Sequence, residues 1–80
     1  MSSGISMTIQ EAQSLLRKIV NAKDGQELER IITSNLHTCD GVFFGQLDNL
    51  VEEYKRRGDT YSAQQLKQVG DHMARLRFMI

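Results

Sequence analysis

Apolar residues recur at steps of three and four residues in four separate runs of this chain, and none of its 80 residues is proline. Steps of three and four place side chains on one face of an α-helix. Proline most strongly interrupts a helix, so the runs lack the main obstacle to helix formation. The pattern predicts an all-α fold, a four-helix bundle within a single domain of residues 8–80. The mostly small and polar residues 1–7 are expected to form a flexible N-terminal tail.

Each of the first three helices is preceded by a side chain suited to capping an N-terminus. Thr8 followed by Glu11 forms a capping box, in which each side chain satisfies the free backbone N–H of the other residue. Asp24 with Glu27 resembles a second cap, and Asp40 precedes the third helix. The apolar faces that follow consist of Ile9, Ala12, Leu16 and Ile19, then Leu28, Ile31 and Ile32, then Phe43, Leu47, Leu50 and Tyr54.

The Gly58-Asp59 pair separates the third and fourth helical runs. Glycine suits the left-handed residue just past a helix C-terminus because it has no Cβ atom to clash. Asp59 or Thr60 can cap the next helix. The pair therefore predicts a structural turn that stops one helix and starts the next. Because the turn is short, the third and fourth helices should form an antiparallel hairpin.

The fourth helix has the most regular apolar spacing. Ala63 and Gly70 lie along its flank, and a glycine inside a helix costs roughly 1 kcal/mol relative to alanine. A small residue there is explained if it lets another helix approach closely. The expected core seam, with the steps of a heptad repeat, consists of Ser62, Leu66, Val69, Met73, Leu76 and Ile80.

The sequence also resembles two kinds of known helical segment. The hairpin resembles a tetratricopeptide repeat, although Val51 and Lys67 stand where that repeat usually has a small and an aromatic residue. About residues 14–77, with the pattern "FFGQLDNLVEEYKRRGD" and a final "ARLR", look like the helical segment that adjoins tetratricopeptide and CHAT-type regions in bacterial, often cyanobacterial, proteins. The resemblance implies a scaffold or protein-binding part. The positions that match the repeat are Leu50, Tyr54, Gly58, Ala63 and Gly70.

The charges are balanced, with 10 Lys and Arg against 10 Asp and Glu. No surplus of positive charge is available to hold a phosphate backbone, so no nucleic-acid partner is expected. The alternative is a small helix-turn-helix-like DNA-binding regulator, whose second helix would present Gln64, Gln65, Lys67 and Gln68 to a groove. A positive patch formed by Lys55, Arg56, Arg57 and Lys67 would favour that alternative.

The residues that could bind a metal or act as a nucleophile are few: His37, Cys39, Asp40 and His72. One cysteine and two scattered histidines lack the recognisable spacing of zinc ligands. A Cys–His pair would require the fold to bring a histidine and an oxyanion site to the thiol. We therefore expect no enzyme, catalytic residue, metal, cofactor or small-molecule substrate, and a packed or half-buried Cys39. A minor enzyme or ligand carrier is the last-ranked alternative.

The expected location is the cytoplasm, without a membrane partner. Cys39 is the only cysteine, which excludes an internal disulfide and suits a reducing compartment. The chain shows no signal-peptide pattern and no apolar run near the length of a membrane span.

The C-terminal sequence "LRFMI" places four apolar residues in the last five: Leu76, Phe78, Met79 and Ile80. They point to different sides of a helix, and a bundle of this size cannot easily cover them all. An exposed apolar cluster usually marks a contact surface. We expect this end to bind a protein partner or a second copy, most simply in a two-fold homodimer. In the alternative, the first helix buries Phe78 within the monomer.

Overall fold

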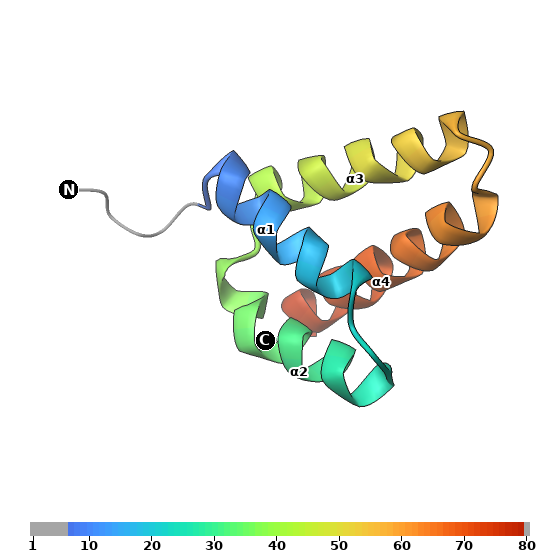
Figure 1. The fold of residues 1–80 in the computed structure, drawn as a ribbon. Coiled ribbons are helices and arrows are strands. Elements are labelled where there is room, and N and C mark those ends of the chain that lie inside the picture. The colour runs from blue at the N-terminus through green and yellow to red at the C-terminus, as the bar shows by residue number, and fades with distance from the viewer. Residues whose placement is uncertain (1–6, 80) are drawn as a thin grey trace.

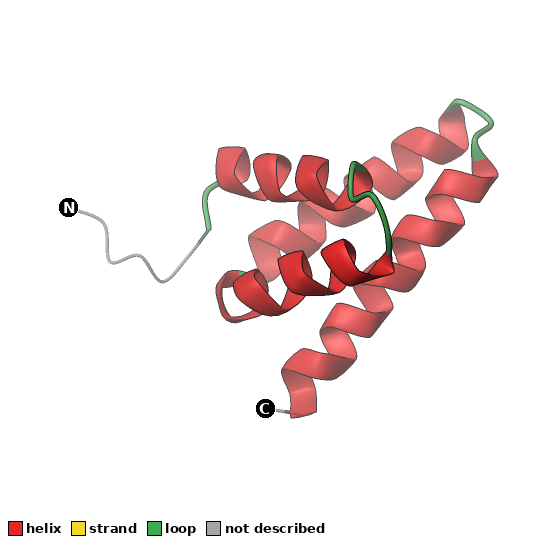
Figure 2. Ribbon diagram, turned by 60° about the horizontal axis from the view of Figure 1, so that its bottom comes forward, coloured by secondary structure: helices red, strands yellow, loops and turns green. Residues whose placement is uncertain are grey.

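The computed structural model describes residues 7–79, and within them it contains helices and no strand. The four α-helices are α1 (Ile9–Val20), α2 (Gly25–Asn35), α3 (Gly41–Arg56) and α4 (Thr60–Met79), and a 3₁₀ turn, η1 (Leu36–Thr38), follows α2. α3 and α4 form the antiparallel hairpin, and α1 and α2 pack on one side of it (Figures 1 and 2). The predicted all-α bundle with its hairpin is confirmed.

The N-terminus of α1 is capped as its sequence indicates. Thr8 Oγ1 accepts a hydrogen bond from the Glu11 N–H at 3.1 Å, and Glu11 Oε1 accepts one from the Thr8 N–H at 2.9 Å. Asp24 caps α2 by accepting from the Glu27 N–H at 2.8 Å. The Glu27 carboxylate accepts from the Lys23 N–H, one residue before the cap, so α2 has a variant of the capping box.

Asp40 joins two distant segments of the chain. Its Oδ1 accepts from the N–H groups of Val42 and Phe43 at the start of α3, at 3.0 and 3.4 Å. Its Oδ2 accepts from the Met7 N–H at 3.2 Å. The Met7 side chain is only 9% exposed and belongs to the core. The expected tail of residues 1–7 therefore extends one residue too far, because the hydrogen bond that the Met7 N–H donates to Asp40 holds Met7 in place. Residues 1–6 lie outside the described part.

Gly58 and Asp59 make the turn between α3 and α4. Gly58 has φ +84°, the left-handed conformation that residues with a Cβ atom rarely adopt. The Asp59 N–H donates to Tyr54 O at 2.9 Å and the Gly58 N–H to Lys55 O at 3.0 Å, which together form a Schellman motif. Asp59 Oδ1 then accepts from the Ser62 N–H and caps α4.

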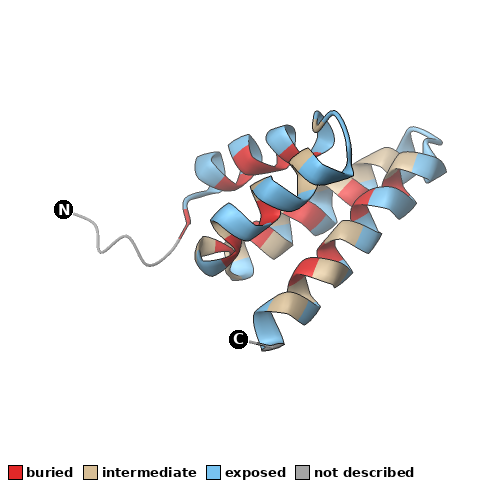
Figure 3. Cartoon of the chain, turned by 90° about the horizontal axis from the view of Figure 1, so that it is seen from below, coloured by how far each residue is buried: buried red, intermediate tan, exposed pale blue. Residues whose placement is uncertain are grey.

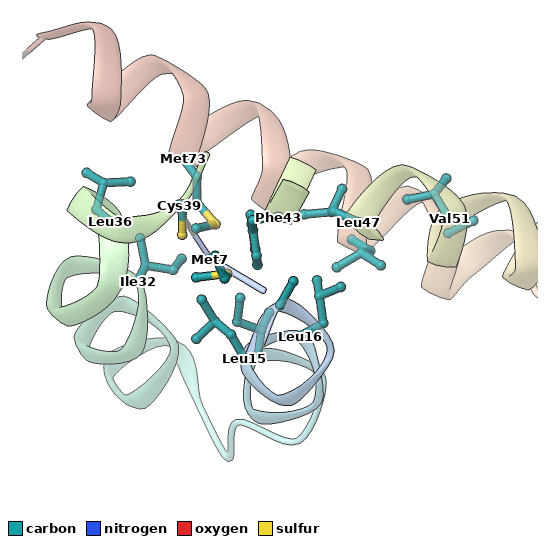
Figure 4. Close-up of a cluster of buried hydrophobic side chains, with 14 residues drawn as sticks. Met7, Leu15, Leu16, Ile32, Leu36, Cys39, Phe43, Leu47, Val51 and Met73 are labelled. Carbon is teal, nitrogen blue, oxygen red and sulfur yellow. The ribbon is translucent and has the colours of Figure 1, made fainter. Parts of the chain in front are cut away.

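The core is a single cluster to which every helix contributes (Figure 4). Phe43 lies within it and is completely buried, with Ile32 of α2, Met73 of α4 and Cys39 also fully buried. The remaining buried apolar residues are Met7, Ala12, Leu15, Leu16, Ile19, Leu36, Leu47, Val51, Ala63 and Leu66.

The buried face of α4 differs from the predicted seam. Ala63, Leu66, Gly70 and Met73 are buried, whereas the predicted seam residues Ser62, Val69 and Leu76 are half-buried (Figure 3). The helix is rotated towards its small residues, because these allow α3 to approach closely.

Candidate interaction surfaces

The predicted partner-binding cluster lies at the end of α4. Phe78 is 91% exposed, and the ribbon of α4 next to the grey C-terminal end is coloured as exposed in Figure 3. Leu76 is half-buried and packs against the core. The Met79 side chain and Ile80 lie outside the described residues. The alternative in which α1 buries Phe78 within the monomer is wrong, because Phe78 is 91% exposed and α1 packs instead against α3 and α2.

Arg77 holds the end of α4 against η1, a role that sequence reasoning missed. Its Nη1 donates to Leu36 O at 3.0 Å and to His37 O at 3.5 Å. These carbonyl groups lie at the C-terminal end of the α2–η1 segment, where the partial negative charge of helix carbonyl groups attracts a cation, and Leu36 O also accepts from the Cys39 N–H at 3.1 Å. The sequence feature that could have indicated this role is the position of Arg77, four residues after the buried Met73. This spacing places the two residues on the same side of α4. Arg77 thus points towards the protein while Phe78 points into solvent.

Cys39 is buried as a thiol. It is 0% exposed, and its Sγ donates to Asn35 O at 3.3 Å. Burial raises the pKa of Cys39 to about 11, with Arg77 lowering it and Asp40 raising it by smaller amounts. Since the thiolate is the nucleophilic form, this thiol is inert near neutral pH. The structure thus confirms a packed thiol in the segment between α2 and α3.

The other candidate ligands remain scattered. His72 of α4 has its Nε2 3.5 Å from Oε1 of Glu29 in α2, a partly exposed pair. Residues 7–79 contain no group of three or more His, Cys, Asp or Glu side chains placed to hold a metal ion. Asp40 uses its carboxylate in backbone hydrogen bonds. Burial alone would raise the pKa of Asp40, but N–H donors at Met7, Phe43, Val42 and Asp40 itself together hold it below its ordinary value.

The four cations that would form a phosphate-binding patch are mostly paired. Lys55 lies 3.5 Å from Glu52, and Arg56 and Arg57 lie 2.9 and 3.6 Å from the two carboxylate oxygens of Glu53. These are exposed pairs within a single helix, so each contributes little stability. Their effect is on the surface field, because two carboxylates offset much of the positive charge at the end of α3. Lys67 has no carboxylate within salt-bridge distance among residues 7–79.

Two surface grooves meet at Val20 and Tyr54. One, of about 200 Å³, lies between the end of α1 and the start of α4, and its mainly apolar lining includes Leu28, Tyr61 and Val69. The other, of about 460 Å³, lies between α1 and α3. The lining of this second groove is more polar and includes the carboxamides of Gln13, Asn21, Gln46 and Asn49. Sequence periodicity alone did not indicate either groove.

None of the helices in the described range has the length and apolarity needed to span a membrane. Comparisons of the chain with protein-family models, with curated proteins and with solved structures found no match.

Proposed function

We propose that this chain is a non-enzymatic protein-interaction or scaffold module, and that it associates with itself through the C-terminal end of α4. The observation that carries the proposal is the exposure of Phe78, a large apolar side chain left 91% in solvent. Burying such a ring against another protein removes apolar surface from water, which is the main driving force for association.

Two further observations support a contact surface at this end. The hydrogen bonds from Arg77 to the carbonyl groups of Leu36 and His37 anchor the last turn of α4, so little conformational freedom is lost when Phe78 is covered. Leu76 adds half-buried apolar surface next to it. A tetratricopeptide-like hairpin in a bacterial protein would be consistent with a scaffold role. The buried thiol of Cys39 is consistent with a cytoplasmic location.

Light scattering over a dilution series tests this function. We expect the apparent mass of the wild-type protein to rise with concentration, and that of Phe78→Ser to stay at the monomer value. Because Phe78 is exposed, the variant should keep the helical circular dichroism and unfolding midpoint of the wild type. Ile9→Ser is the matched control, since Ile9 is also exposed but lies at the start of α1. A wild-type protein that remains monomeric at every concentration would contradict self-association.

A further inference from the structure

α4 carries a second seam on the side opposite its buried face. Its residues follow steps of three, four, three, four and three, the spacing of positions that face a partner helix in a coiled coil. All six are exposed, and α3 packs instead on the face of Ala63, Leu66, Gly70 and Met73. This outer stripe consists of Tyr61, Gln64, Gln68, Asp71, Arg75 and Phe78.

The outer stripe is symmetric about the midpoint between Val69 and Gly70. Tyr61 and Phe78 are equally far from that point in the sequence, and so are Gln64 and Arg75, and Gln68 and Asp71. In an antiparallel pair of identical helices, residues equally far from a two-fold axis lie opposite each other. We propose that the outer stripe binds the same stripe of a second copy, antiparallel, with Tyr61 of each copy against Phe78 of the other. The inference rests on the self-association proposed above and specifies its geometry.

The apolar groups of the stripe favour this alignment. Tyr61 is 73% exposed and Phe78 is 91% exposed, the two highest values among the large apolar residues that the structure describes. They lie near opposite ends of a helix of 20 residues, which is about 30 Å long. The Phe78 of one copy therefore cannot reach its own Tyr61, whereas an antiparallel partner brings the two rings together at both ends of the interface. Aromatic pairs of this kind stabilise interfaces beyond their buried area.

The charges in the middle of the stripe favour the same alignment. Neither Lys67, beside the stripe, nor Asp71, within it, has an ion-pair partner among residues 7–79. In the antiparallel pair, Gln68 of one copy faces Asp71 of the other. Lys67 is the neighbour of Gln68 in the sequence, so it can form an ion pair with Asp71 of the other copy. The two-fold symmetry produces this pair twice. A parallel pair in register would instead oppose Asp71 to Asp71 and Arg75 to Arg75, and like charges across an interface disfavour association.

The handedness of the stripe is also compatible with helix pairing. A strict heptad spacing drifts by about 20° per heptad on a straight α-helix, so the stripe winds slowly around α4. Two helices that cross at about +20° follow such a stripe along their length. With polar residues in the middle and aromatic residues at the ends, the contact should be weak and reversible, which makes covalent trapping the suitable test.

Disulfide trapping between two variants tests the alignment. Gln64→Cys and Arg75→Cys change exposed residues that face each other only in the antiparallel pair. We expect their mixture, under mild oxidation, to yield a product of twice the monomer mass on a non-reducing gel, and each variant alone to yield none. Wild type controls for the buried Cys39. A mixture of Gln64→Cys with Asp48→Cys, an exposed position on α3, controls for random collision.

Each outcome decides the question. Linkage confined to the Gln64→Cys and Arg75→Cys mixture supports the antiparallel alignment. Linkage of Gln64→Cys with itself would overturn it in favour of parallel copies. Linkage no greater than in the Asp48→Cys control, with wild type still dimerising by sedimentation, would overturn the alignment and leave self-association standing. The same absence of linkage with a wild type that is monomeric throughout would overturn both.

Discussion

A Cβ atom placed on Gly70 of α4 would lie 2.9 Å from Cδ2 and 3.3 Å from Cδ1 of Leu47 in α3. Both methyl groups of Leu47 thus occupy the space that a side chain at position 70 would need. Leu47 is itself buried, so it cannot turn away into solvent. The absence of a side chain at Gly70 lets the two long helices pack closely at the centre of the hairpin.

Gly70→Ala should therefore destabilise the protein despite favouring the helix. The gain in helix propensity is about 1 kcal/mol. Overpacking a core typically costs about 1–3 kcal/mol, which is the larger effect because Leu47 is enclosed. We expect a net loss of about 1 kcal/mol in the free energy of unfolding, measured by urea denaturation.

Gly45→Ala is the matched control for Gly70→Ala. Gly45 lies in α3, is exposed, and has nothing within 4 Å of the position of an added Cβ atom. This substitution should stabilise the protein by about 1 kcal/mol. In a Leu47→Ala background, Gly70→Ala should lose its penalty, because the two sites are coupled through one contact. An equal effect of Gly70→Ala in both backgrounds would show that Leu47 is not the obstacle.

Gly58→Ala should destabilise the α3–α4 turn without any clash. Nothing lies within 4 Å of an added Cβ atom at Gly58, but its φ of +84° is unfavourable for any residue with a Cβ atom. The expected loss is about 1–2 kcal/mol in the free energy of unfolding. Gly25→Ala, at the first position of α2, has equally open surroundings and no positive φ, and it should not destabilise the protein. A denaturant midpoint for Gly58→Ala equal to that of wild type would rule out the Schellman turn.

The buried thiol predicts a loss of stability at alkaline pH. Burial raises the pKa of Cys39 to about 11 in the folded protein, against about 8.5 in an unfolded chain. Between these values the unfolded state releases the proton and the folded state keeps it. The contribution of Cys39 is therefore complete below about pH 8.5 and decreases as the pH rises towards 11.

The measurement is the free energy of unfolding in urea between neutral and alkaline pH, with reductant present. We expect the wild type to lose more stability across this range than Cys39→Ala, which has no thiol to ionise. The same thiol should react with a disulfide reagent at neutral pH only when the protein unfolds. Parallel pH profiles for the two proteins, or rapid labelling of the native state, would show that Cys39 is accessible.

Local features of the fold could be predicted from the sequence, and long-range ones could not. Thr8 with Glu11, and Gly58 with Asp59, act on neighbours within a few residues, so their types and order were sufficient. Met7 is held by Asp40, and Arg77 by the carbonyl groups of Leu36 and His37, through hydrogen bonds between residues 33 or more positions apart. Nothing in the local spacing indicates such pairs.

The orientation of α4 shows the same limit. Its most regular apolar pattern placed Ser62, Val69 and Leu76 in the core seam, but the close approach of Leu47 requires a small residue at position 70. That requirement depends on α3 and outweighs the local pattern. The exposure of Phe78 likewise depends on long-range packing, because η1 contacts α4 whereas α1 packs against α3 and α2. The C-terminal sequence "LRFMI" indicated an apolar cluster at this end, but only the fold shows that the Phe78 side chain is exposed to solvent.

Finally, the chain should show no sequence-specific binding to duplex DNA. Strong binding to phosphates requires a surplus of positive charge, yet the chain has 10 Lys and Arg against 10 Asp and Glu, and Lys55, Arg56 and Arg57 lie beside Glu52 and Glu53. The expected result of a fluorescence-anisotropy titration with genomic fragments is weak association that disappears as salt approaches the physiological range. Glu53→Gln provides an internal check: by freeing two arginines, it should strengthen this weak association without making it selective. Sub-micromolar, sequence-selective binding by the wild type would instead favour the regulator over the scaffold.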